Sequence, residues 1–386
     1  MSPDRPEPPP APDSGAVASP DVVAHARQQA AACRRLGAPF TGALCDAAAD
    51  DVERGGPLAA VLAGDPWSPG PSALALRFVG ALQRLVLAGQ APELAALYPS
   101  EHRPDGDAVA AAALLPAVVG AHGATLRAGL GVAPQTNEVG RTAALWGGLL
   151  GLVADGVGAG LAGPGGTVPV ALVDLGSSAG LLLQADRVRM TGADGSACGP
   201  EGSPVRLEGA WDVAPWAPGP PPLVRVVERD GVDVAPLDPA DPDHARRLRS
   251  FVWPEQRARV RRLEGALALA RAHPVRVRRA SAGDLARELT LRPGVVTVLW
   301  HAVVRQYVPA EELDALERTL HRLGEQASAA APLVHLAVEP GQPPDGGVTG
   351  FPVTASAWGG PGATGRPRRL GAAGPHGPPV RWETRG

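Results

Sequence analysis

Apolar residues recur at three- and four-residue steps through the first part of the chain. This spacing places them on one side of a helix. Asp21 is positioned to cap the first helix and Gly37 to end it. The predicted helical segments are 21–37, 71–89, 105–130 and 138–161. No alternating strand pattern interrupts them, so we predict an α-helical region over 21–165. The proline-rich residues 1–20 lack an apolar core and predict a disordered tail, not a signal peptide.

The pattern changes from Pro169 onward, where short apolar runs of strand character alternate with helical segments. The predicted strands are 168–176, 223–234, 275–284, 295–304 and 333–340. The predicted helices are 181–190, 243–273, 284–289 and 309–327. This alternation predicts an α/β domain over 166–386 with a Rossmann-like, doubly wound, mainly parallel sheet of the class I methyltransferase kind. Residues 191–222, rich in Gly and Pro, predict an insertion, and 351–358 with 378–383 predict a terminal antiparallel hairpin.

The segment "VDLGSSAGLLL" forms the turn after the first predicted strand. Its literal G-x-S-x-G match is typical of a nucleophile elbow with Ser178 as the nucleophile. A hydrolase elbow follows earlier strands and needs an oxyanion loop on one of them, whereas everything upstream here is predicted helical. Gly176 and Gly180 instead favour a turn that holds a cofactor. The alternative is a strand–turn–helix junction that binds nothing.

Asp174, two residues before the first glycine, indicates which cofactor suits this turn. A carboxylate here repels a pyrophosphate, so a nicotinamide dinucleotide is disfavoured. It suits a ligand that carries an amine or a positive charge, which is the pattern of an S-adenosylmethionine motif. Ser178 stands where that motif has its middle glycine. We therefore predict that Asp174, Gly176, Ser178 and Gly180 bind S-adenosylmethionine.

Later strand ends supply the other parts of such a site. Asp233, or alternatively Asp230, is placed to bind a ribose, unless both belong to a solvated turn. Asp284 is placed to face an adenine amino group, or to cap the helix that follows. His301 is the candidate general base, although it could simply hydrogen-bond the next helix. Tyr307 follows in a segment that we expect to line the same cleft.

The segment "PQTNEVGR" concentrates polar groups between two apolar helices. In one interpretation, Thr136 or Asn137 caps the next helix and Glu138 pairs with Arg141 one turn later. In the other, this segment leans over the cofactor turn and contacts the substrate through Gln135, Asn137, Glu138 and Arg141. The sequence leaves both open.

Several of these segments together resemble the bacterial family known as domain of unknown function 2332. The similarity runs from about Ala26 to Pro340 and is carried by several motifs. They are "ARQQAAACRRLGAPFTGALCDAAADD", "PQTNEVGRTAAL", "VDLGSSAGLLLQADRVRM", "RDGVDVAPLDPADPDHARRLRSFVWPEQRARVRRLEGAL" and "VLWHAVVRQYV". Ser177 replaces the family's usual alanine, and Leu182 replaces an asparagine that is a potential ligand contact. The resemblance implies a methyltransferase-like Rossmann region and no established reaction.

The amino-acid composition argues against several classes of binding partner. A net charge of −3 offers no general attraction to nucleic acid or anionic membranes. Every apolar run as long as a membrane span is interrupted by Gly or Pro. Three widely spaced cysteines suit neither a disulfide framework nor a zinc knuckle, so we expect no metal and a cytoplasmic location. The sequence thus predicts a methyltransferase that acts on a small molecule, or alternatively a non-catalytic binding or regulatory module. It leaves the oligomeric state open.

Overall fold

The computed structural model describes residues 20–62, 73–216, 218–341, 350–360 and 363–383. The tail predicted over 1–20 lies outside these residues except for Pro20, which begins the first helix. The chain forms two compact units. The helical unit contains the described residues up to Thr136 together with Arg246–Val260, and the α/β unit contains Asn137–Ala245 and the described residues from Arg261 onward.

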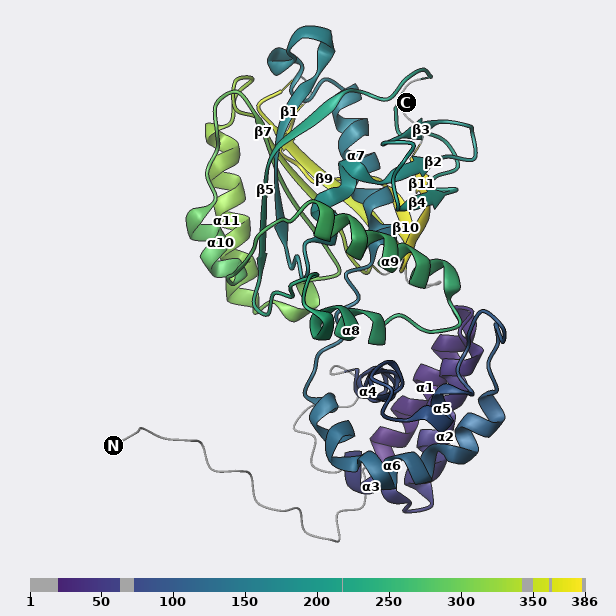
Figure 1. Ribbon diagram of the computed structural model, residues 1–386. Helices are drawn as coiled ribbons and strands as arrows, with labels where there is room; N and C mark the ends of the chain where they lie inside the picture. Colours follow the sequence, from purple (N-terminus) through teal and green to yellow (C-terminus); the bar gives the residue numbers. More distant parts are fainter. Residues whose placement is uncertain (1–19, 63–72, 217, 342–349, 361–362, 384–386) are drawn as a thin grey trace. The chain divides into compact units, whose positions relative to one another are not determined.

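The helical unit is built from helices whose apolar faces meet in one core (Figure 1). They are α1 (Pro20–Arg35), α2 (Pro39–Glu53), α3 (Pro57–Leu62), α4 (Leu74–Leu87), α5 (Pro92–Ala95) and α6 (Ala108–Leu130). Phe40, Leu82 and Leu115 are almost fully buried in this core. The Phe40 ring contacts the edge of the Tyr98 ring, with 4.9 Å between the ring centroids. The predicted helical character of this region is confirmed.

Helix α6 is, among the described residues, the one helix long and apolar enough to cross a membrane by length and composition. Pro116 lies inside it, and the backbone leaves helical geometry at His122. Leu115, Val119 and Leu126 of this helix are buried and belong to the core of the helical unit. This is the packing expected of an apolar helix inside a globular domain.

The α/β unit contains an eight-stranded sheet in the order β11-β10-β9-β8-β7-β1-β5-β6. The parallel strands are β1 (Val168–Leu175), β5 (Val224–Asp233), β6 (Val277–Arg279), β7 (Val296–Ala302) and β8 (Leu333–Val338). The antiparallel strands that follow are β9 (Phe351–Trp358), β10 (Arg368–Gly374) and β11 (Gly377–Trp382). All five predicted parallel strands are present. Central strand β1 is apolar almost throughout because both of its faces are covered.

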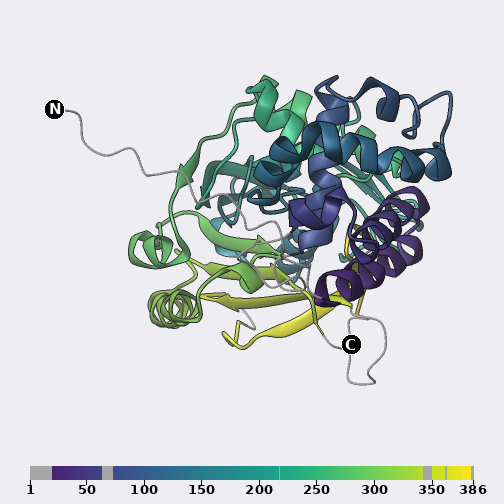
Figure 2. The same cartoon turned by 90° about the horizontal axis from the view of Figure 1, so that it is seen from below.

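Helices cover both faces of this sheet (Figure 1). Helices α10 (Ala282–Glu288) and α11 (Ala310–Gln326) run side by side on one face, as Figure 2 also shows. Leu316 and Leu320 of α11 pack there against Leu299 of β7. On the other face lies α7 (Thr142–Ala154), where a side chain at Gly148 would come within 3.2 Å of Leu336. Because α7 packs on the sheet, the boundary between the units falls at 136/137 and not near 165 as predicted.

Two local predictions require correction. The segment 181–190 is not an α-helix: it forms the short 3-10 helix η4 (Leu181–Arg187) and then β2 (Arg189–Thr191). Residues Leu181–Ala185 are all buried, so this run has no polar face of the kind an amphipathic surface helix needs. Strand β2 pairs with β3 (Ala197–Cys198) and β4 (Arg206–Glu208), so the predicted insertion holds a small sheet.

The predicted terminal hairpin is the second correction. The terminal strands β9 and β11 do not pair directly, because β10 lies between them.

Candidate functional site

The sheet changes winding direction beside β1. From β1 the chain first adds β5 and β6 on one side and then β7 and β8 on the other. In open α/β sheets, ligands bind outside the carboxyl ends of the strands at such a switch point. This end of β1 carries Asp174 and the glycine turn, and the same end of β7 carries His301. The topology therefore brings the sequence-predicted residues of both strands to one edge of the sheet.

Asp174 is a buried carboxyl group, only 1% exposed. The Ser177 hydroxyl donates a hydrogen bond to its Oδ2 atom at 2.7 Å. Burial raises the pKa of Asp174 to about 7; the Ser177 hydroxyl and the Trp300 indole oppose this rise, and the nearby Asp233 carboxylate adds to it. Strongly shifted carboxyl groups of this kind cluster at functional sites.

The turn after Asp174 has left-handed backbone conformations at three positions. The φ angles are +74° at Gly176, +53° at Ser178 and +69° at Gly180. A Cβ atom at Gly176 would lie 2.4 Å from a methyl carbon of Val304, so that position accepts no side chain. Glycine avoids the steric cost of this conformation, whereas Ser178 has to bear it. A non-glycine residue held in this region is an indicator of a functional site.

The backbone amides of this turn are bonded within the protein. The amides of Gly176 and Ser177 donate to the carbonyl oxygen of Val232 at 2.9 and 3.1 Å. The Ser178 amide donates to Oδ2 of Asp233 at 2.8 Å. Asp233 also accepts the Ala235 amide through Oδ1 at 2.7 Å. Asp233 thus reaches the glycine turn, and both of its carboxylate oxygens contact backbone amides.

Asn137 braces the same turn from the other side. Its Nδ2 atom donates to the carbonyl oxygen of Ser177 at 3.1 Å, and its Oδ1 atom accepts the Leu181 amide at 3.0 Å. The "PQTNEVGR" segment therefore contacts the glycine turn through the Asn137 side chain. Asn137 is itself 8% exposed and has a φ of +40°.

The neighbours of Asn137 have other contacts. Glu138, and not Thr136 or Asn137, caps the 3-10 helix η1 (Val139–Arg141), accepting the Gly140 amide at 3.2 Å. Glu138 also lies 3.7 Å from Nδ1 of His376. Arg141 donates through Nε and Nη2 to the carbonyl oxygen of Pro375, both at 3.3 Å. Gln135 belongs to the helical unit. The structure thus joins Glu138 and Arg141 to the β10–β11 connection.

The Ser178 hydroxyl is buried and has no hydrogen-bond partner among the described residues. A nucleophile elbow requires a base that accepts the serine proton. No base in the described part of the chain hydrogen-bonds to the Ser178 hydroxyl, which disfavours the hydrolase hypothesis. The same unpaired hydroxyl is available to a polar ligand.

Asp284 and Tyr307 lie apart from these contacts. Asp284 is the third residue of α10, where its carboxylate accepts the Ser281 amide at 2.9 Å and its own amide donates to the Ser281 hydroxyl. Asp284 thus belongs to a reciprocal capping box at the start of α10 and also forms an ion pair with Arg287. Tyr307 lies in the 3-10 helix η5 (Arg305–Tyr307) and is 59% exposed.

His301 occupies a different face of the sheet from Asp174. In the pairing of β1 with β7, Asp174 is opposite Trp300 and Leu175 is opposite His301. Successive strand residues point to opposite faces, so the two side chains diverge. Nδ1 of His301 lies 2.6 Å from Oε1 of Glu339, and Nε2 lies 3.0 Å from Nε2 of His335.

Glu339 and His335 were not predicted from the sequence, although a signal for them exists. In the run "LVHLAVEP" they stand four residues apart. The two-residue period of a strand places them on one face, and parallel pairing with β7 sets that face beside His301.

The scan against family profiles matched residues 23–382 to DUF2332, a family described as an uncharacterised protein conserved in bacteria. The match covers nearly the whole chain. The chain belongs to the DUF2332 family. No curated protein and no solved structure matched this DUF2332 chain.

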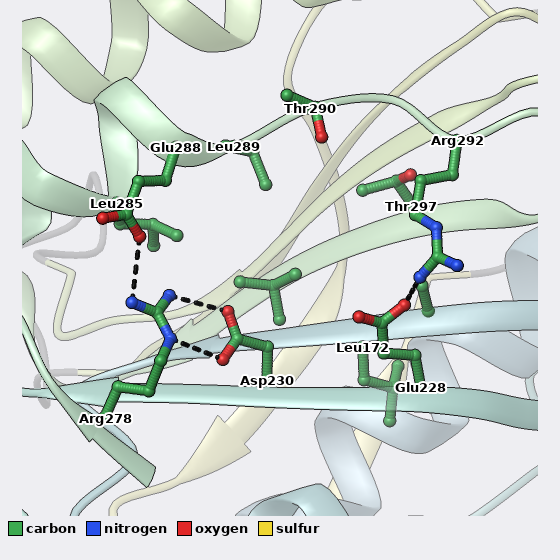
Figure 3. A pocket seen from close by; sticks show the side chains of 12 residues that line it. Leu172, Glu228, Asp230, Arg278, Leu285, Glu288, Leu289, Thr290, Arg292 and Thr297 are labelled. Carbon is green, nitrogen blue, oxygen red and sulfur yellow. Dashed lines mark hydrogen bonds and ion pairs between the residues drawn. The ribbon is translucent and has the colours of Figure 1, made fainter. Parts of the chain in front are cut away.

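The DUF2332 chain has a further cavity of about 260 Å³ beside α10 (Figure 3). Arg278 lies there between Asp230, which it binds through two nitrogens at 2.8 and 2.9 Å, and Glu288 at 2.9 Å. Arg292 forms an ion pair with Glu228 in the same view. Asp230 is therefore committed to Arg278, which leaves Asp233 as the acid at the glycine turn. The described residues contain no group of three or more His, Cys, Asp or Glu residues suited to a metal ion.

Proposed function

We propose that the α/β unit is a Rossmann-like domain that binds S-adenosylmethionine and transfers its methyl group to a small molecule. The observation that carries this proposal is the meeting of Asp174, the glycine turn and Asp233 at the carboxyl ends of two adjacent parallel strands. An acid before the turn and an acid after the second strand are the two carboxylates such a cofactor needs, one for its amino group and one for its ribose.

The strand order supports the same proposal. The parallel part runs β6-β5-β1-β7-β8, which places the first strand at the switch point between two halves. This is the doubly wound arrangement in which nucleotides bind across the ends of the first two strands. The antiparallel strand β9 pairs with β8 on the side away from β1.

The residues at the turn fit the cofactor in three respects. Asp174 is buried beside the turn, where a positively charged ligand would favour its ionised form. Asp233 contacts the turn directly, and in this proposal its carboxylate also accepts the ribose hydroxyls. The Ser178 hydroxyl is buried without a partner, so a polar ligand group would satisfy it. When bound, the cofactor would supply an electrophilic methyl group.

In this proposal the protein contributes mainly binding and orientation. Methyl transfer is an in-line displacement, so the precise placement of the two reactants accounts for much of the rate. Asn137 fixes the turn from both sides and thereby fixes where the ligand sits. His301 remains the proposed base for an acceptor that must lose a proton, and because its ring nitrogens are bonded to Glu339 and His335 that proton would reach it through His335.

Calorimetry with S-adenosylmethionine and S-adenosylhomocysteine tests the proposal. We expect wild-type protein to bind both ligands, and Asp174→Asn and Asp233→Asn to bind about ten- to a hundredfold more weakly. This range corresponds to the loss of one hydrogen bond to a charged group. Asp314→Asn, on the exposed side of α11, is the matched control and should bind like the wild type. No heat at ligand concentrations of about 1 mM would refute the cofactor assignment.

A second candidate is a non-catalytic module that binds a partner and uses the fold without the cofactor. The observation that favours it is the internal bonding of the turn, where Val232, Asp233 and Asn137 already occupy backbone amides. Failure of both ligands to bind would select this candidate. Binding of both ligands without transfer to any acceptor would select a regulatory domain that senses the cofactor.

We further propose a cytoplasmic location for the protein. Cys33, Cys45 and Cys198 are all buried free thiols. Unpaired thiols persist in reducing compartments, whereas oxidising ones favour disulfides.

A further inference from the structure

Three titratable side chains form a hydrogen-bonded row that joins β7 to β8 and to the residue just after β8. Glu339, His301 and His335 follow one another at 2.6 and 3.0 Å. His301, in the middle, is 1% exposed and has a ring nitrogen bonded on each side. The row begins at a carboxylate and ends at a second imidazole, His335. It lies on the α11 face of the sheet, away from the side chain of Asp174.

The hydrogen bonds define where the protons of this row lie. Oε1 of Glu339 also accepts the Val304 amide at 3.1 Å, which favours an ionised carboxylate there. Nδ1 of His301 then donates to Glu339, and its Nε2 atom is the acceptor of a proton from Nε2 of His335. The remaining nitrogen of His335, Nδ1, is left with a lone pair.

His335 and Glu339 line a cavity of about 350 Å³ between α11, β8 and β9. Leu320 and Trp358 contribute apolar surface to its wall. Ser356 stands opposite His335 in the pairing of β8 with β9 and adds a hydroxyl to the wall. Apolar side chains and several polar or charged groups thus share the wall of this cavity.

Charged groups of both signs and the imidazole of His321 line the cavity. Arg305, in its wall, is held by Glu317 with 2.7 Å between Nη2 and Oε1. Glu339 adds a second carboxylate. Burial, with the adjacent His301 and Arg305, lowers the pKa of His335 to about 3, so that imidazole is neutral near neutral pH. A neutral imidazole has a lone pair that can accept a proton from a ligand.

We propose that this cavity binds small uncharged molecules with a weakly acidic hydroxyl group, phenols being the simplest, and that His335 is the base that ionises them. The O–H bond of the ligand breaks and an Nδ1–H bond forms on His335. The Nε2 proton of His335 moves to Nε2 of His301, whose positive charge then lies against the carboxylate of Glu339. The step needs no other reactant and is independent of cofactor binding at the glycine turn.

The row explains why the charge is stable once the proton has moved. An imidazolium on His335 would lie at the cavity wall, close to Arg305. The same charge on His301 lies 2.6 Å from a carboxylate in a buried position, where electrostatic attraction is strong. Glu339 is thus a positioning residue, since it acts on the ligand through His301.

Binding of 4-nitrophenol, whose phenolate form is yellow, tests the proposal by visible absorption. The measurement is made about one unit below the pKa of 4-nitrophenol in water, where little of the free compound is ionised. We expect wild-type protein to raise the phenolate band on binding. His335→Gln should bind the phenol with at least a tenfold smaller phenolate fraction. Glu339→Gln, which keeps the shape of the side chain, should lower that fraction as well.

His102→Gln, which replaces a histidine of the helical unit, is the matched control and should behave as the wild type. Circular dichroism establishes that each variant is folded, and Glu339→Gln carries the test if His335→Gln is not. Equal phenolate fractions in the wild type and the folded relay variants would overturn the proposal. A lack of 4-nitrophenol binding to the wild-type protein would overturn it too. S-adenosylhomocysteine binding measured on His335→Gln is expected to be unchanged, which separates this site from the proposed function.

Discussion

Asp174→Asn is expected to stabilise the α/β unit at about pH 8, by up to about 4 kcal/mol in the free energy of unfolding. Burial raises the pKa of this carboxyl from its ordinary value of 3.8 to about 7 in the folded protein. Near pH 8 folding must therefore hold an ionised carboxylate where the neutral form is preferred. Asparagine resembles that neutral form and can still accept the Ser177 hydroxyl.

The sign of the pH dependence follows from proton linkage. Between pH 3.8 and about 7 the folded protein binds the Asp174 proton more tightly than the unfolded chain does. The free energy of unfolding therefore falls as pH rises through this window, and the contribution of Asp174 levels off above it. In Asp174→Asn this contribution is absent, so the variant and the wild type should differ little at low pH and most at high pH.

Urea unfolding of the wild type and Asp174→Asn across this pH range measures the effect, with Asp314→Asn as the control. A constant difference between the two proteins at every pH would contradict the assignment of a raised pKa to Asp174. Together with the calorimetry, the experiment also tests whether the gain in stability of Asp174→Asn is accompanied by weaker ligand binding. A residue that destabilises the fold and is needed for ligand binding is the usual trade-off at a functional site.

Gly176→Ala is expected to destabilise the α/β unit by about 3 kcal/mol. The alanine would have to adopt a φ of +74°, which costs about 1–2 kcal/mol for an L-residue. Its Cβ atom would also lie 2.4 Å from a methyl carbon of Val304, and overpacking typically costs about 1–3 kcal/mol. Urea unfolding of the purified variant measures the sum.

Gly294→Ala separates these two causes. Gly294 has a similar φ of +82°, but a Cβ atom there would have no other atom within 4 Å. This control should lose only the conformational part, about 1–2 kcal/mol. If Gly176→Ala lost no more than Gly294→Ala, close packing of the turn against Val304 would be refuted.

The sequence was most informative where a residue's neighbours along the chain decide its role. The strand β1, the turn at Gly176 and the capping role open to Asp284 are each visible within a few residues of sequence. The prediction of an α-helix over 181–190 was wrong because the local pattern does not show how the run packs in the folded protein. Burial of Leu181–Ala185 on all sides overrides the helical preference of the run.

The candidate site was predicted only in part, because its contacts join distant segments. Asp174, Gly176 and Asp233 were placed correctly at strand ends. The sequence did not show that Asn137 bonds to Ser177, a contact that spans forty residues. It also gave no measure of how deeply Asp174 is buried.

By itself the sequence determined the five parallel strands, their order along the chain and the family to which the chain belongs. Apolar spacing and glycine positions decide these locally, through helix and strand periodicity. Only the tertiary structure decided that Asp174 and His301 point to opposite faces of the sheet, and that His335 and Glu339 join His301. The physical reason is strand register. Pairing partners along a strand are set by the packing of the whole sheet, and a shift of one residue exchanges its two faces.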